Sequence, residues 1–221
     1  MINFAIPSLL ASFILIFVFT FSSILNYKNR FKMDYHIRNY YPYELNYESK
    51  FKDNFTGNVA ICLYGAFGIF FYTIFDSSYL NGFLIFDLIA GSLLTLALVS
   101  LVFIPLKRLK VHLLMVFISI VLAFLVPFSN ALASSIAYRN EQATGSMVMM
   151  IVNALYCLFI FILIINPKLS HWAELKKETN PDGTVKYVRP KVFILALIEW
   201  LLILTSPLLM VLTLLTQQFG I

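Results

Sequence analysis

The stretch FILALIEWLLILTSPLLM, residues 193–210, decides the fold class of this chain. It holds one titratable group, Glu199, inside a long apolar run. About 20 apolar residues are needed for an α-helix to cross the roughly 30 Å hydrocarbon core of a bilayer. The run has neither the helical nor the alternating hydrophobic period that marks a single buried face. We therefore interpret residues 192–215 as a transmembrane helix that carries a carboxylate.

The rest of the chain has the same apolar character. Of its 221 residues, 60% are hydrophobic and 12% are charged, whereas roughly a quarter of the residues of a soluble domain are charged. Five further blocks are long enough to span a bilayer; they cover about residues 4–25, 58–75, 80–104, 111–128 and 146–165. The fourth block has an uncertain end, which Tyr138 would mark if the helix continues. The sequence thus predicts an all-α, polytopic integral membrane protein, a six-transmembrane-helix bundle forming a single domain over 1–221.

The positions of lysine and arginine predict the orientation of this bundle. Fifteen of the 16 lie in the first, third and fifth connections between predicted helices, and Arg139 is the exception. Such residues are enriched in cytoplasmic loops. We therefore expect the loops 26–57 and 166–191 to be cytoplasmic and both termini to be outside, an N-out/C-out topology. The phenylalanine-rich, alanine-poor composition is typical of an AT-rich bacterial genome, so we expect the membrane to be a bacterial cytoplasmic membrane.

These loops also supply candidate contact residues. Tyrosine and tryptophan anchor proteins at lipid headgroups, and tyrosine and arginine are favoured at protein interfaces. Two interpretations stay open, binding of anionic lipid headgroups and docking of a partner. The candidates are Arg30, Lys32, Arg38, Tyr40, Tyr41, Tyr43, Lys107, Arg108, Lys110 and Trp172. In the second loop, the Asn-Pro-Asp-Gly turn at 180–183 and the alternation after it predict a short β-hairpin.

Two acids, Glu199 and Asp87, fall inside predicted spans. At 1.5 Å per helical residue Glu199 lies about 10 Å from the inner boundary and Asp87 at most about 10 Å from the outer one. Because they lie in opposite halves of the bilayer, we expect no direct dyad. His112, at the cytoplasmic start of the fourth span, is the basic group nearest Glu199. Other polar candidates at similar depths are Ser119 and Thr20 near Glu199, and Asn153 and Asn130 near Asp87.

Two interpretations of these acids are weighed. Interhelical hydrogen bonds contribute only about 1 kcal/mol in membranes but fix helix register. Alternatively, intramembrane acids line proton or cation pathways. On the second interpretation, the chain is a transport component for a small solute or ion, proton-linked through Glu199. The alternative function is a non-catalytic membrane-complex subunit, scaffold or immunity-type protein that docks a partner through its tyrosine-rich loop.

Several classes of activity have no support in the sequence. It contains no nucleotide-binding, metalloprotease or serine-hydrolase motif and nothing that resembles a nucleic-acid-reading module. We expect no catalytic residues, no cofactor and no metal site. Because a six-helix bundle leaves many helix faces outward, we expect a homo-oligomer or a complex with another membrane-protein subunit.

Overall fold

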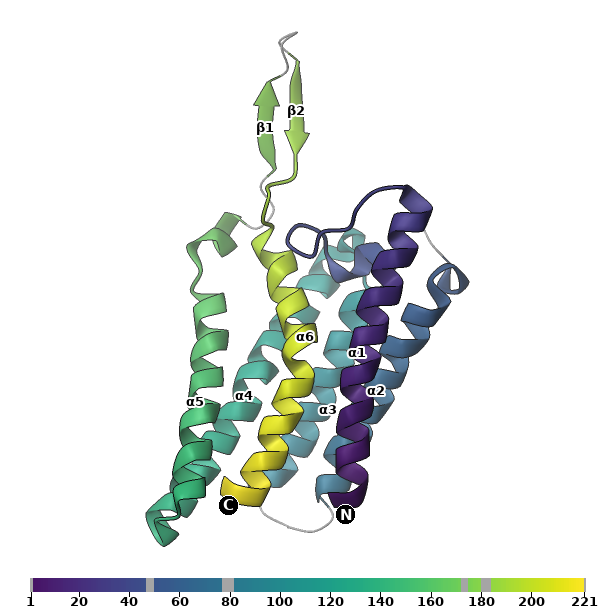
Figure 1. Cartoon of the computed structure of the whole chain (residues 1–221). Coiled ribbons are helices and arrows are strands. Elements are labelled where there is room, and N and C mark those ends of the chain that lie inside the picture. Colours follow the sequence, from purple (N-terminus) through teal and green to yellow (C-terminus); the bar gives the residue numbers. More distant parts are fainter. Residues whose placement is uncertain (1, 47–49, 77–81, 172–174, 180–183, 221) are drawn as a thin grey trace.

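The computed structural model describes residues 2–46, 50–76, 82–171, 175–179 and 184–220. Six long helices run up and down (Figure 1). They are α1 (Ile2–Phe31), α2 (Phe55–Asp76), α3 (Gly82–Phe103), α4 (Leu109–Glu141), α5 (Thr144–Ile164) and α6 (Ile194–Leu215). Strands β1 (Lys176–Thr179) and β2 (Val185–Val188) pair antiparallel, with Lys176 opposite Val188. Short helical turns occupy Pro42–Asn46, Phe51–Asn54, Leu106–Arg108, Pro167–His171 and Thr216–Gly220.

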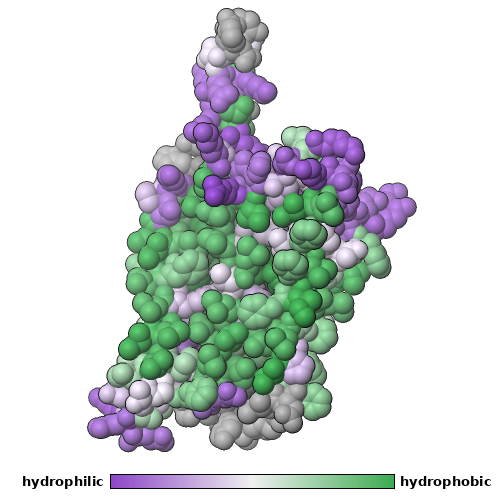
Figure 2. Space-filling view, in the orientation of Figure 1, coloured by the Kyte–Doolittle hydropathy of each residue, from purple (hydrophilic) through white to green (hydrophobic). Residues whose placement is uncertain are grey.

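All six helices are long and apolar enough to cross a membrane, which indicates an integral membrane protein. Figure 2 shows, on the face in view, an apolar band across the middle of the bundle with hydrophilic residues at both ends. The antiparallel strand pairing that the sequence predicts is confirmed, whereas the predicted turn at 180–183 lies outside the described residues. Strands β1 and β2 project beyond one end of the bundle (Figure 1). The two chain termini lie at the opposite end. We refer below to the hairpin end and the terminal end.

Two helices are longer than their apolar blocks. α4 runs to Glu141, past Tyr138, so the extension that the sequence left open is present. α1 continues through the polar residues after Leu25 to Phe31. A helix boundary predicted from hydropathy falls where charged residues begin, but lysine, arginine and asparagine can continue a helix. α1 ends where Lys32 adopts a left-handed conformation and its N–H donates to the Lys28 carbonyl.

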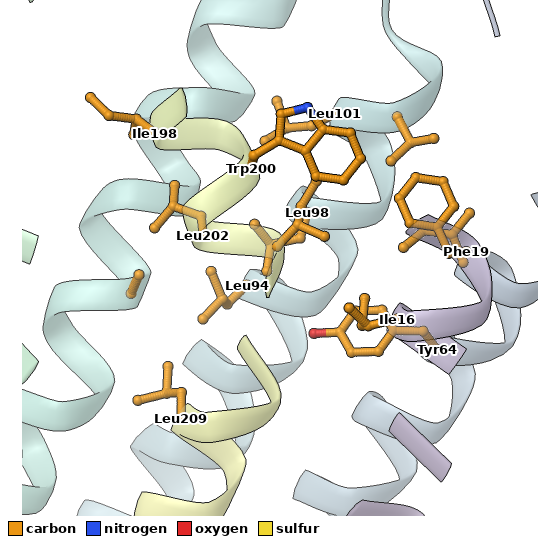
Figure 3. Packing of buried hydrophobic residues seen from close by; sticks show 14 of the residues in the cluster. Ile16, Phe19, Tyr64, Leu94, Leu98, Leu101, Ile198, Trp200, Leu202 and Leu209 are labelled. Atoms are coloured by element: carbon orange, nitrogen blue, oxygen red, sulfur yellow. The ribbon is translucent and has the colours of Figure 1, made fainter. Parts of the chain in front are cut away.

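α6 is the central helix of the bundle. Two thirds of its most apolar window is buried, against 28% for α5. Figure 3 shows Trp200 of α6 packed among Leu98 and Leu101 of α3 and Phe19 of α1. The Phe19 and Trp200 rings stack with centroids 6.0 Å apart. Since lipid is as apolar as these side chains, close packing rather than water exclusion holds the helices together.

A proline inside α6 is compensated by its neighbours. Pro207 has no N–H to donate to the carbonyl of Ile203. The Ser206 hydroxyl donates to that carbonyl instead, at 2.7 Å. The Tyr64 hydroxyl of α2 then donates to Ser206 Oγ at 2.6 Å, and Figure 3 shows this hydroxyl pointing toward α6. The backbone group freed by proline is thus satisfied within the protein, as a membrane interior requires.

The first connection folds back over the hairpin end of the bundle. Tyr35, Tyr41 and Tyr43 are buried there, and the backbone N–H of Phe193, just before α6, donates to the Arg38 carbonyl at 2.7 Å. Trp200 Nε1 donates to the Tyr35 hydroxyl at 3.1 Å and to a neighbouring backbone carbonyl at 3.0 Å. The tyrosines therefore form part of the core, which corrects the expectation that Tyr41 and Tyr43 face headgroups or a partner.

Candidate functional site: a buried histidine–carboxylate pair

The central feature of the hairpin end is an ionisable pair between α4 and α6. His112 Nε2 lies 2.9 Å from Glu199 Oε1, and both side chains are completely buried. The sequence singled out His112 as the basic group nearest Glu199, and the structure brings the two together. The other carboxylate oxygen, Glu199 Oε2, has no hydrogen-bond partner among the described residues.

The far side of the histidine ring fixes its tautomer. His112 Nδ1 lies 2.7 Å from the carbonyl oxygen of Ile104. A carbonyl only accepts, so Nδ1 carries a hydrogen. Ile104 follows the last residue of α3 and precedes Pro105; proline has no N–H and disfavours helix at the residue before it. The carbonyl is therefore free to accept from another helix.

This geometry determines how many protons the pair holds. With Nδ1 protonated, the contact between Nε2 and Oε1 is attractive only when one proton lies between them. That proton makes the pair either imidazolium and carboxylate or neutral imidazole and carboxylic acid, and both forms have a net charge of zero. Without it, the Nε2 lone pair would face a carboxylate in a medium of low dielectric constant, which is repulsive.

Aromatic rings cover the histidine at the hairpin end. The Tyr41 and Tyr43 rings meet the imidazole edge-on, with centroids 6.1 Å and 5.5 Å from it. Burial raises the pKa of Tyr41, and the negative charge of Glu199 adds to this effect. Tyr41 is therefore a neutral phenol over the whole working range of pH. We call Tyr41 and Tyr43 the tyrosine roof.

An ion pair between the two long connections holds this roof. Arg189, at the base of β2, donates to both carboxylate oxygens of Glu44, at 2.9 Å and 2.6 Å. Glu44 also accepts from the Tyr41 backbone N–H at 2.7 Å. The guanidinium lies 4.8 Å from the centroid of the Tyr40 ring. The pKa of Arg189 is raised, chiefly by the hydrogen bonds to Glu44. Bidentate pairs of this kind fix orientation as well as contributing energy.

The remaining polar candidates bond to other partners. Ser119 donates to the Met115 carbonyl of its own helix at 2.8 Å, not to Glu199. Thr20 Oγ1 has no partner among the described residues. Asn130 of α4 donates to Thr213 at 3.2 Å, and Asn153 of α5 donates to Thr216 at 2.8 Å. These last two contacts tie α4 and α5 to the end of α6.

Asp87 stands apart from the pair, as the sequence analysis expects. It lies five residues into α3, whereas Glu199 lies five residues into α6, and these two helices start at opposite ends of the bundle. Asp87 is 2% exposed, and neither of its oxygens has a hydrogen-bond partner in the described part of the chain. Asn153 is bonded to Thr216, the residue after α6, rather than to Asp87.

The basic candidates lie on the surface of the hairpin end. Lys32, Arg38, Lys107, Arg108 and Lys110 are exposed. The guanidinium of Arg30 lies 4.8 Å from the centroid of the Phe31 ring, and Tyr40 is partly buried. Trp172 lies outside the described residues. Within them, no group of three or more His, Cys, Asp or Glu could hold a metal ion.

Sequence reasoning missed the Glu44–Arg189 pair and the role of the tyrosines as a roof. The two charged residues are 145 positions apart, and each lies in a connection with several other charges. No local pattern distinguishes them. Glu44 and Arg189 can be recognised as a pair only in the folded structure, where the two connections lie together.

No family model, no curated protein and no solved structure matches this chain.

Proposed function

We propose that this chain is a transport component for a small solute or ion, and that the His112–Glu199 pair is its proton-binding site. The supporting observation is a completely buried pair that shares one proton and has a second carboxylate oxygen without a described partner. Helix packing alone does not require such a pair, since apolar side chains avoid its desolvation cost. Titratable groups of this kind are typical of proton and ion pathways.

We also propose an N-out/C-out orientation in a bacterial cytoplasmic membrane. The connections and helix ends at the hairpin end carry fifteen of the 16 lysine and arginine residues, the distribution that favours the cytoplasmic side. The exposed Lys107, Arg108 and Lys110 would then contact anionic headgroups of the inner leaflet. In this orientation the tyrosine roof lies between the pair and the cytoplasm.

Proton release and movement of the roof are coupled in this proposal. When the bridging proton leaves to water, a carboxylate faces the Nε2 lone pair across 2.9 Å. The deprotonated pair must separate or bind a cation. We expect either event to displace Tyr41 and Tyr43, whose rings contact the imidazole. A solute that binds while the roof is displaced is therefore transported in step with the proton.

The test is charge movement in proteoliposomes on a solid-supported membrane, with panels of amino acids, organic acids, sugars, nucleosides and inorganic ions added in turn. We expect one class to give a current whose amplitude depends on pH. Glu199→Gln should remove that pH dependence. Thr205→Val, a substitution on the same helix away from the pair, is the control. A Glu199→Gln protein with unchanged currents and unchanged pH dependence would rule out the proposed role.

A non-catalytic subunit of a membrane complex is the second candidate. The exposed side chains of β1 favour it, because an isolated two-stranded hairpin is only marginally stable in water. The low burial of α5 also leaves a helix face for a partner. Purification in mild detergent distinguishes the candidates. A second protein that copurifies in stoichiometric amount, and is lost when residues 176–188 are replaced by a short glycine-serine linker, supports the subunit function.

A further inference from the structure

The terminal end of the bundle contains a second buried carboxylate, which the proposed function does not use. Asp87 on α3 is 2% exposed, and both of its oxygens lack a hydrogen-bond partner among the described residues. An ionised carboxylate in such an environment, with no compensating charge, carries a large desolvation cost. Its charge must therefore be neutralised by something bound to it.

In the part of the chain that the structure describes, no lysine or arginine contacts the carboxyl group of Asp87. The ion pairs Lys28–Asp34, His112–Glu199 and Glu44–Arg189 all lie toward the hairpin end. Arg139 is the cation of α4 at the terminal end, and its side chain is exposed. It lies ten residues, about 15 Å along the helix, from Ser129, the α4 residue beside Asp87.

The groups around Asp87 are oxygen ligands. The Ser129 hydroxyl of α4 lies beside the carboxyl group, and it too lacks a hydrogen-bond partner in the described part of the chain. Tyr72 of α2 is the titratable neighbour. α4 and α6 add uncharged groups at this level, Asn130 and Thr213, which bond to each other. The described groups beside Asp87 are thus a hydroxyl and a phenol.

A close helix contact positions Tyr72 at this site. A Cβ atom at Gly91 would lie 2.4 Å from the Tyr72 ring, so only glycine lets the ring cross α3 here. Gly91 is four residues after Asp87 and therefore on the same helix face. The ring of Tyr72 covers the carboxylate side of α3.

We propose that Asp87 and Ser129 form a binding site for one monovalent cation, a proton or an alkali-metal ion, at the terminal end of the bundle. One carboxylate and a few neutral oxygens match a single positive charge, whereas protein sites for divalent ions generally combine several carboxylates and carbonyls. Proton and alkali ion use the same carboxylate, so they exclude each other. The site is independent of the His112–Glu199 pair, because the two lie at opposite ends of the bundle.

The test is the thermal unfolding midpoint of the purified full chain in detergent, with sodium, potassium or choline chloride at equal ionic strength, over a series of pH values. A ligand that binds only the native protein raises the midpoint. An alkali ion should raise it relative to choline at alkaline pH, and the difference should shrink as protons replace the ion. Asp87→Asn should remove the response, and Ser129→Ala should require about tenfold more salt.

Ser119→Ala is the matched control, a buried serine-to-alanine change on the same helix but toward the hairpin end; its response should equal that of the wild type. If the ions act alike, infrared difference spectra identify a proton as the ligand. The wild type then has a carboxylic acid band at neutral pH that Asp87→Asn removes. If wild type and Asp87→Asn respond identically to every salt and show the same carboxylic acid bands, the proposal is overturned.

Discussion

At the scale of single residues, hydrogen-bond donors and acceptors determine the arrangement of the hairpin end. Ile104 fixes the hydrogen on Nδ1 of His112, and this leaves Nε2 to share a proton with Glu199. Glutamine at 199 can donate an amide hydrogen to the same Nε2. Leucine cannot. The two substitutions therefore separate the structural role of the contact from its titration.

We expect Glu199→Gln to unfold with nearly the wild-type free energy and Glu199→Leu to lose about 2 kcal/mol, because leucine leaves a buried acceptor unsatisfied. The measurement is equilibrium unfolding in mixed detergent micelles. Leu202→Ala, an apolar change on the same helix, calibrates the loss from packing alone. Equal stability of the glutamine and leucine variants would contradict the inferred hydrogen bond.

Buried tyrosines give the protein a defined response to alkali. Burial raises the pKa of Tyr35 well above its ordinary value of 10.0 and also raises that of Tyr41. Their stabilising contribution is complete below pH 10 and is lost as pH rises above it, because the unfolded phenols ionise first. We expect Tyr35→Phe to make stability fall less steeply with pH in this range. Unfolding at a series of alkaline pH values measures the slope, with Tyr138→Phe, a partly buried tyrosine of α4, as the control.

At the scale of elements, the prolines in the helices are predictable from the sequence, but their compensation is not. Pro207 marks a missing hydrogen bond in α6 from its identity alone. That Ser206 supplies the replacement and that Tyr64 holds Ser206 follows only from the packing of α2 on α6. The helix blocks were found because hydropathy is local. The end of α1 and the tyrosine roof could not be predicted from hydropathy, because they depend on contacts made by polar segments.

A double-mutant cycle tests the compensation. Ser206→Ala should cost about 1 kcal/mol, the usual size of a hydrogen bond between membrane helices. In a Pro207→Ala background, the restored N–H of residue 207 bonds to the Ile203 carbonyl, so the same serine change should cost less. Unfolding free energies of the four proteins give the coupling. Additive costs would show that Ser206 does not replace the missing donor.

At the scale of the whole molecule, the helix count and the hairpin follow from the sequence, as does the separation of Glu199 from Asp87. Orientation stays a prediction from the charges. Single cysteines at Lys107 and Lys177, in a background with Cys62 and Cys157 replaced, should be labelled from the same side of the membrane, and a cysteine at Arg139 from the other. Membrane-impermeant maleimide on intact and on permeabilised cells reads this out. Labelling of positions 107 and 177 from different sides would refute the proposed topology.

The ion pair between Arg189 and Glu44 couples the β-hairpin to the tyrosine roof. Arg189 directly follows β2 and bonds to Glu44, and Phe193 contacts Arg38 just before α6. We therefore expect a displacement of the strands to act on the tyrosine roof above His112. A nanobody that binds β1 and β2 would therefore stabilise either the closed or the displaced position of the tyrosine roof, depending on the strand orientation that it selects.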